Sequence, residues 1–353
     1  MNNEVSTKYD NRRFLTAMWL LALALFMLVA ANLMIGSVKI PAKEVMSIVC
    51  GTESENPAWQ VIVMQTRLPM IITAILAGAA LSVSGLLMQT AFNNPLAGPS
   101  ILGVSTGASL GVAIVMLAFG GYIGTLFGTT VGGYVSILVG ALLGAALILT
   151  TLLIFSTIVK SSSMLLIVGI MVGYLASSAI SFLNFFATEQ GVHSYVIWGL
   201  GNFSGVTMSQ LPVFAAIIAV SLLWAALMVK PLNAMLLGER YAENLGVNMR
   251  RARNQLLIIT GVLTAVVTAF CGPIGFIGLV VPHIARLLLR TSNHNYLIPA
   301  TIIAGADIAL LCTLISVLPT SIGIMPINAI TPMIGVPIII YIILNRKKIK
   351  YFN

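Results

Sequence analysis

Residues 14–36 read FLTAMWLLALALFMLVAANLMIG, an apolar run of about 23 residues without a charged side chain. A helix that crosses the hydrocarbon core of a bilayer needs about 20 such residues, whereas the apolar core of a secretory signal peptide has only about 7–15. The length therefore predicts a retained transmembrane helix. Arg12 and Arg13 precede the run, and their positive charges favour a cytoplasmic N-terminus.

Composition extends this interpretation to the whole chain. Hydrophobic residues make up 59% of the 353 residues, and charged residues only 8%. A soluble domain carries roughly 25% charged residues, so this chain cannot cover a globule of its size with a hydrated surface. The net charge of +9 would ordinarily suggest nucleic acid as a partner. The charges instead lie at the ends of apolar segments, so we expect a lipid bilayer and no nucleic acid. Three scattered cysteines are too few for a disulfide framework or a Cys-rich metal site.

The apolar segments predict an all-α polytopic membrane protein with ten transmembrane helices, several of them broken by glycine or proline. They cover residues 14–36, 69–91, 95–118, 131–159, 164–187, 212–229, 255–271, 275–290, 297–318 and 328–345. Breaks at Asn93-Asn94-Pro95 and Gly272-Pro273 are tolerated at membrane depth only where protein or a water-filled cavity covers the freed backbone groups.

An even number of spans with a cytoplasmic start places both termini in the cytoplasm. All but three of the 18 lysines and arginines then lie on the cytoplasmic side, as the positive-inside rule requires. The exceptions are Lys39, Lys43 and Arg67.

This topology places the charged stretch LLGERYAENLGVNMRRARNQ, residues 236–255, in the cytoplasmic loop between the sixth and seventh spans. The basic residues at its ends are enough to orient the helices, but its interior residues are not needed for that. On a helix, Leu237, Tyr241 and Leu245 would form an apolar stripe, with Glu239 and Glu243 on another face. Such a helix is suited to docking into the groove of a soluble partner. A solvated turn without a partner is the alternative.

Five ordered motifs resemble the permeases of bacterial ABC importers for ferric siderophores, haem and cobalamin, the cobalamin and iron-chelate permease family of type II importers. Gly238-Glu239, followed by Ala242, Leu245 and Gly246, is similar to the coupling loop of that family. The other motifs are Arg67-Leu68-Pro69, GAALSVSGLLMQTAFNNPLAGPSILGVSTGASLG at 78–111, GPIGFIGLVVPHIARLL at 272–288 and Ile334-Gly335-Val336-Pro337. The resemblance runs from about residue 35 to residue 346.

The resemblance implies a single transmembrane permease domain at 14–346, with cytoplasmic tails at 1–13 and 347–353 and a coupling loop at about 234–252. Two copies would enclose a pathway in the bacterial inner membrane for a ferric siderophore, haem or cobalamin. Two ATPase subunits would dock at the coupling loops, and a periplasmic binding protein would deliver the substrate. The chain has no Gly-x-x-x-x-Gly-Lys phosphate loop. We therefore expect no enzymatic activity, no metal or cofactor on this chain, and ATP only on the partner ATPase.

The resemblance also implies roles for particular residues. The residues expected to couple to the ATPase are Leu237, Gly238, Glu239, Tyr241, Ala242, Leu245 and Gly246. A cytoplasmic gate would lie at Ser161, Ser162 and Ser163, whose hydroxyls also suit a helix N-cap. On the fifth span, the candidate pathway residues are Ser178, Ser181, Asn184 and Phe185. Arg67, which we expect to be exposed at the outer start of the second span, is the candidate docking point for the binding protein.

Small residues recur at every fourth position in two spans, which is typical of close helix packing in membranes. The fourth span carries Gly132, Ser136, Gly140 and Gly144, for which we expect packing alone. In the fifth span Gly169, Gly173, Ser177 and Ser181 lead towards the pathway candidate Asn184.

The sequence departs from the family pattern where the binding protein would dock. Met70 replaces a second arginine that often follows Arg-Leu-Pro, and Thr313, Val317 and Ile324 stand where cobalamin-type members carry Asp, Arg and Glu. We therefore expect docking to depend on few ion pairs, and instead on apolar contact around Met70, Ile324 and Met325 or on a partner with a different face.

Asp307, the acid deepest in a predicted span, leaves open a proton-coupled secondary transporter as the alternative function. A purely structural membrane scaffold is a third reading, which the broken helices fit poorly.

Overall fold

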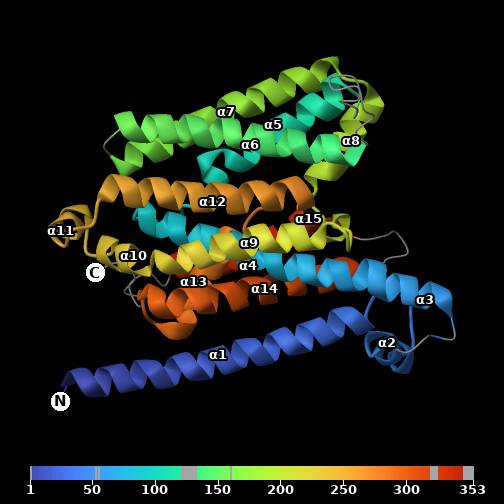
Figure 1. Cartoon of the computed structure of the whole chain (residues 1–353), viewed down its shortest axis with the longest axis horizontal. Coiled ribbons are helices and arrows are strands. Elements are labelled where there is room, and N and C mark those ends of the chain that lie inside the picture. The colour runs from blue at the N-terminus through green and yellow to red at the C-terminus, as the bar shows by residue number, and fades with distance from the viewer. Residues whose placement is uncertain are drawn as a thin grey trace. The chain divides into compact units, whose positions relative to one another are not determined.

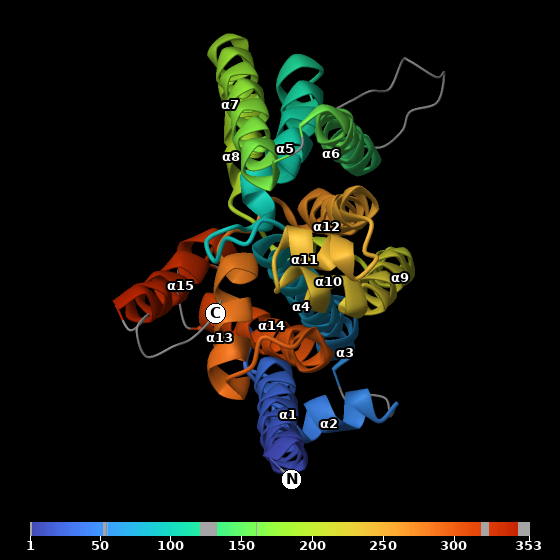
Figure 2. The same ribbon diagram turned by 90° about the vertical axis from the view of Figure 1, so that its left-hand side faces the viewer.

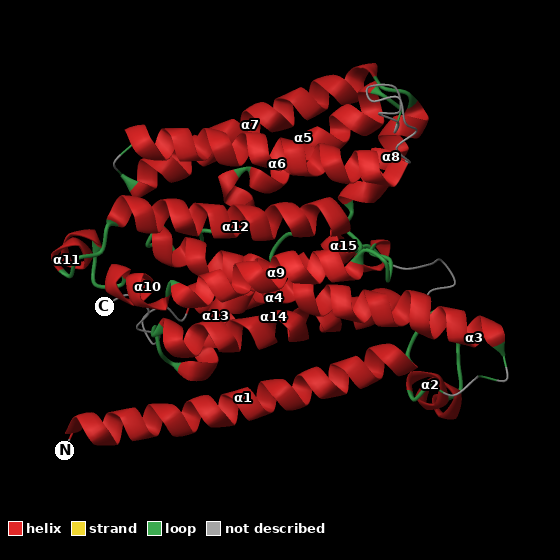
Figure 3. Ribbon diagram, in the orientation of Figure 1, coloured by secondary structure: helices red, strands yellow, loops and turns green. Residues whose placement is uncertain are grey.

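The computed structural model of the chain describes residues 2–51, 54, 56–120, 133–159, 161–318 and 325–344. Every regular element within these ranges is a helix (Figure 3). The chain divides into two compact units built from alternating segments. The first contains Met1–Val83, Phe203–Ala215 and Phe276–Asn353, and the second contains Ser84–Asn202 and Ala216–Gly275. The expected tail at 347–353 lies outside the described residues.

Six described helices are long and apolar enough to cross a membrane. They are Arg12–Met34 within α1 (Asn2–Met34), Pro57–Ala91, α6 (Gly133–Ile158), α7 (Ser162–Phe186), α12 (Met249–Cys271) and α14 (His294–Val317). A further span is the pair α9 (Leu211–Leu227) and α10 (Val229–Met235), which is bent by 52°. Three shorter apolar helices are Val104–Ala118, formed by α5 (Val104–Ala113) and η3 (Ile114–Ala118), then α13 (Ile277–Leu289) and α15 (Ile327–Leu344). These elements correspond to the ten predicted spans, and the all-α polytopic fold is confirmed.

The second span begins earlier than residue 69, where the sequence predicted it. Its helix starts at Pro57 and consists of α3 (Pro57–Val61), η1 (Ile62–Arg67) and α4 (Leu68–Ala91). The Asn56 side chain caps this start by accepting a hydrogen bond from the Ala58 N–H. Pro57 suits the first helical turn, where its missing N–H would have no partner in any case. Hydropathy did not predict this extension, because residues 65–67 are polar and interrupt the apolar run.

Both predicted backbone breaks are present. The α4 helix ends at Ala91 and is followed by Asn93 with a φ of 43°. The α12 helix ends at Cys271 and is followed by Gly272 with a φ of 77°.

Within the first unit, α14 packs against α1, α13 and α15. Figure 1 shows α1 running alongside α14. Gly78 of α4 and Gly305 of α14 permit a close approach, because a Cβ at either position would overlap the other glycine's carbonyl oxygen. The Arg13 Nε donates to the Leu288 carbonyl oxygen at 2.9 Å. The basic start of the first span therefore lies at the same end as the close of α13, as the predicted topology requires.

Within the second unit, α5 lies between α6 and α7, and α12 packs against both α5 and α6 (Figure 2). Gly140 and Gly144 of α6 meet Gly111 and Gly107 of α5, where an added Cβ would overlap backbone atoms. The packing role predicted for the fourth span is confirmed at these positions; Gly132 lies outside the described residues. The first two glycines of the α7 stripe, Gly169 and Gly173, lie against η2 (Pro99–Leu102) and Gly103.

Candidate functional site

The predicted coupling loop forms a short helix, α11 (Glu239–Asn244), held between two glycines. Gly238 has a φ of 99° and Gly246 a φ of 86°, and no atom of the described residues would obstruct a Cβ at either position. Glycine is therefore needed there for its backbone conformation. The Ala242 side chain is fully buried and anchors the helix to the second unit.

Three large apolar side chains around α11 are exposed. The exposed fraction is 62% for Leu237, 54% for Tyr241 and 58% for Leu245. The prediction of one continuous helical stripe is wrong, because the helix covers only Glu239–Asn244 and the two leucines flank it. All three side chains are nonetheless open to the surface of the chain. Beside Leu245 lies a hollow of about 480 Å³ whose lining includes Lys230 and Arg251.

Glu239 contacts the predicted gate directly. The Ser162 Oγ donates to the Glu239 Oε1 at 2.5 Å. The same carboxylate oxygen lies 3.9 Å from the Arg253 Nη2. Arg253 is buried and its Nη1 donates to the Val159 carbonyl oxygen at 3.4 Å, just after α6 ends. The coupling helix, the end of α6 and the start of α7 are thus joined through one carboxylate and one guanidinium.

The other two predicted gate serines make no comparable contact among the described residues. Ser161 occupies the N-cap position of α7, but its side chain forms no capping hydrogen bond. Ser163 is exposed on the first turn. Sequence reasoning had treated Arg253 only as a charge that sets helix orientation, because its contacts come from segments far away in the chain.

The structure separates the four predicted pathway residues. Ser181 faces a hydroxyl-lined pocket, whereas Ser178 faces a different, largely apolar hollow between α5 and α7. The Asn184 Oδ1 is buried without a hydrogen-bond partner among the described residues. Phe185 is 82% exposed and packs edge-on against Phe186, with ring centroids 5.0 Å apart.

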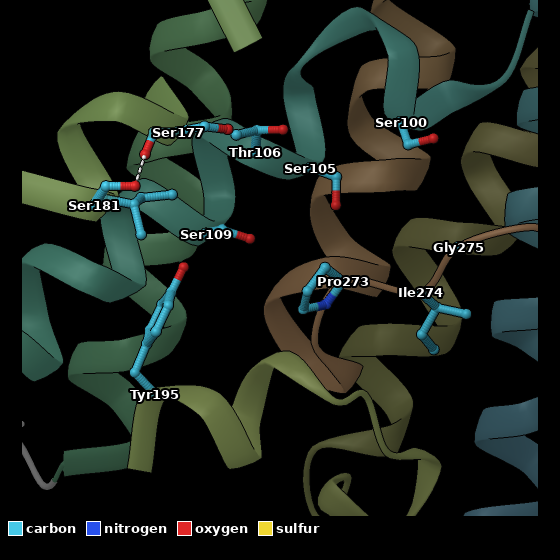
Figure 4. A pocket seen from close by; sticks show the side chains of 11 residues that line it. Ser100, Ser105, Thr106, Ser109, Ser177, Ser181, Tyr195, Pro273, Ile274 and Gly275 are labelled. Carbon is cyan, nitrogen blue, oxygen red and sulfur yellow. Dashed lines mark hydrogen bonds between the residues drawn. The ribbon is translucent and has the colours of Figure 1, made fainter. Parts of the chain in front are cut away.

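The hydroxyl-lined pocket is built from α5, α7, α8 (Glu189–Gly199), η2 and the loop after α12, all in the second unit (Figure 4). Its volume is about 480 Å³. Its lining residues are Ser100, Ser105, Thr106, Ser109, Ser177, Ile180, Ser181, Tyr195, Pro273, Ile274 and Gly275. Sequence reasoning missed most of these hydroxyls. The i, i+4 spacing of Ser105 and Ser109 was the available local signal for a shared helix face.

Arg67 is buried, with only 3% of its surface exposed, so the expectation of an exposed outer arginine is wrong. Its guanidinium donates to the carbonyl oxygens of Leu33 and Val38 at 2.5 Å and of Met34 at 3.3 Å. Free carbonyls at the end of a helix attract a cation, and α1 ends at Met34. Met70 is also buried and offers no outer apolar contact. Ile324 lies outside the described residues.

Asp307 is 8% exposed in α14, and both carboxylate oxygens lack a hydrogen-bond partner among the described residues. His283 and Arg286 are buried in α13. No group of three or more His, Cys, Asp or Glu side chains that could hold a metal ion occurs within the described ranges.

Ten apolar helical elements, several of them bent or broken, define a polytopic membrane protein. Residues 22–345 match the FecCD transport family, and the chain belongs to that family. It is the non-catalytic, multi-pass permease component of a bacterial ABC importer.

The vitamin B12 import system permease protein BtuC of Klebsiella pneumoniae is 36% identical over 332 residues, covering 93% of this chain and 94% of that protein. The protein of the same name from Citrobacter koseri is 35% identical over 337 residues, covering 94% and 95%. The fold matches a solved metal-chelate type ABC transporter in an inward-facing conformation, with a TM-score of 0.77 and 29% identity. That match covers 94% of this chain and 98% of the other.

Proposed function

We propose that two copies of this chain enclose an import pathway in the bacterial inner membrane for a metal chelate, either an iron complex or cobalamin. Two ATPase subunits bind ATP and drive the cycle from the cytoplasm, and a periplasmic binding protein delivers the substrate. Family membership and the names of the relatives support this cargo class. The chain itself supplies the path and the mechanical connection, not the hydrolysis.

The exposed triplet Leu237, Tyr241 and Leu245 carries the proposal for ATPase docking. These three apolar side chains are more than half exposed and lie beside Glu239 and Arg240. A lipid-facing surface does not suit them, because charged residues avoid the hydrocarbon. They suit an apolar groove on a soluble partner. Lys230 and Arg251 beside Leu245 favour an acidic rim on that groove.

Substituting aspartate into the triplet tests this docking. Leu237→Asp with Leu245→Asp should abolish co-purification with the ATPase subunit and its stimulated ATP hydrolysis, because buried unpaired carboxylates at an interface are costly. Glu243→Gln, an exposed change on the same short helix, is the control and should preserve both. Normal assembly and stimulation in the double variant would contradict the docking proposal.

We also propose roles in the cytoplasmic gate and the transport pathway for residues of α7 and the residue before it, based on family membership and on their contacts and exposure. Ser161, Ser162 and Ser163 line the cytoplasmic gate, and Ser162 receives movement of α11 through Glu239. Ser178, Ser181, Asn184 and Phe185 line the pathway from α7, with the exposed Phe185 facing the cargo or the second copy. Arg67 supports binding-protein docking indirectly, by fixing the segment after α1.

A further inference from the structure

The hydroxyl-lined pocket is unusual in so apolar a chain. Seven hydroxyl-bearing side chains contribute to its lining, from α5, α7, α8 and η2. Polar groups inside a membrane protein are costly unless they bond to one another or face a water-filled or ligand-filled cavity. Some bonds are internal, because the Ser181 Oγ donates to the Ser177 carbonyl oxygen at 3.1 Å. The Ser105 Oγ and the Thr268 Oγ1 lie 3.2 Å apart.

Several hydroxyls that take part in such bonds also border the open cavity. Figure 4 shows the side chains of Ser105, Ser109 and Tyr195 directed towards the space beside Pro273. The volume of about 480 Å³ falls within the roughly 300–1,000 Å³ typical of small-molecule pockets. The pocket therefore has both the room and the hydrogen-bonding groups to contact a ligand.

The pocket has no cation among its lining residues. No Asp, Glu, Lys or Arg occurs in the described parts of α5, η2, α7 or the loop at 272–275. On α8 the only charged residue of these four types is the acidic Glu189. His193, also on α8, is exposed and outside the lining. Burial raises the pKa of Tyr195 to about 12, partly offset by the Ser109 hydroxyl, so the phenol stays neutral at physiological pH. Nothing in the pocket would compensate the charge of an anionic ligand.

We infer that this pocket binds one face of an uncharged metal chelate rich in carbonyl, amide or hydroxyl groups, and that it disfavours polyanionic chelates. The inference rests on the proposed transport function and adds the substrate class. Neutral hydroxyls both donate to and accept from such groups. A polyanion would have to leave water without a balancing cation, at a cost that the pocket's hydroxyls only partly offset.

Equilibrium binding to the purified permease in nanodiscs, without any ATPase subunit, tests the inference. The probes are a neutral ferric trihydroxamate, neutral cyanocobalamin and a trianionic ferric tris-catecholate. At least one neutral probe should bind about tenfold or more tightly than the tris-catecholate, a difference of about 1.4 kcal/mol. Saturation by the trihydroxamate alone would identify an iron chelate, and saturation by cyanocobalamin alone would identify a corrinoid.

Two variants connect binding to the pocket. Ser177→Ala and Tyr195→Phe each remove one lining hydroxyl and should weaken the neutral probe roughly threefold to tenfold. Ser194→Ala and Tyr174→Phe make the same chemical changes at exposed positions outside the lining and should leave its affinity unchanged. Thermal unfolding of all four variants checks that each is folded.

Three outcomes would overturn the inference: equal or tighter binding of the tris-catecholate, no saturable binding of any probe, or equal effects of the pocket variants and their controls. Each is separate from a failure of the proposed function. That failure would appear as a permease that neither assembles with an ATPase subunit nor stimulates it, whatever the binding results in nanodiscs.

Discussion

The Ser162 Oγ donates a 2.5 Å hydrogen bond to the Glu239 Oε1, although the two residues are 77 positions apart. Glu239 begins the helix that we propose as the ATPase dock, and Ser162 begins α7, which contributes to the hydroxyl-lined pocket. A direct side-chain contact therefore joins α11 to the start of α7. Arg253 holds the same carboxylate and fixes its position relative to the end of α6.

The first prediction is that breaking this hydrogen bond uncouples hydrolysis from transport. In proteoliposomes with the ATPase and binding protein, Ser162→Ala should leave ATP hydrolysis nearly unchanged and lower substrate uptake per ATP by about threefold to tenfold. A threefold to tenfold change corresponds to about 0.7–1.4 kcal/mol, within the roughly 0.5–1.5 kcal/mol that one typical hydrogen bond contributes. Glu239→Ala also removes the contact with Arg253, so its loss of uptake should be at least as large.

The double variant Ser162→Ala with Glu239→Ala distinguishes a shared contact from two separate effects. If the residues act through their hydrogen bond, the double variant should be no worse than the more severe single variant. Glu243→Gln controls for the loss of negative charge on α11. Fully additive losses would show that the two residues act independently.

The second prediction concerns the glycine contact between α5 and α6. Gly144→Ala places a Cβ against the Gly107 carbonyl oxygen, a backbone atom that cannot move alone. Overpacking of this kind typically costs about 1–3 kcal/mol, so thermal unfolding in detergent should begin at a lower temperature. Gly199→Ala in α8 is the matched control, because among the described residues no atom outside its own helix turn lies within 4 Å of the added Cβ. An equal unfolding temperature for both variants would contradict the packing assignment.

The fold could be predicted largely from sequence because its signals are local. Apolar length set the spans, and Gly272-Pro273 marked where α12 ends. The Ser162–Glu239 contact left no such signal, since neither residue's neighbours indicate the other. The same is true of the hydroxyl-lined pocket, where Ser105, Ser177 and Tyr195 come from three separate helices. Arg67 was misplaced for a related reason. Its partners are backbone carbonyls of another segment, and backbone acceptors cannot be recognised from residue type.

The third prediction is that Asp307 carries no proton needed for transport. Its carboxyl group is buried in α14 without a hydrogen-bond partner among the described residues, and the function that we propose draws its energy from a separate ATPase subunit. Asp307→Asn keeps the shape and removes the acid, so ATP-driven uptake in proteoliposomes should stay within about twofold of the unsubstituted protein. Uptake driven by a pH gradient without ATP, and lost in this variant, would establish proton coupling instead.

The fourth prediction is that Arg67 acts on binding-protein docking through shape and not through charge. Its guanidinium joins the carbonyls of Leu33 and Met34, where α1 ends, to that of Val38 in the following loop. Arg67→Ala would leave these carbonyls without their cation. Because hydrogen bonds to a charged group contribute about 1.5–3 kcal/mol, the unfolding temperature should fall by several degrees.

Gly36→Ala should reproduce the effect, since its Cβ would lie 2.6 Å from the Arg67 Nη2. Arg67→Lys should rescue little, because one ammonium cannot reproduce the planar fork of the guanidinium. Lys43→Ala, at an exposed position, controls for loss of positive charge.

Affinity for the binding protein should fall together with stability, and by the same factor at low and high salt, because surface charge screening does not reach a buried side chain. A steeply salt-dependent loss of affinity in Arg67→Ala, at an unchanged unfolding temperature, would instead show that Arg67 meets the binding protein directly.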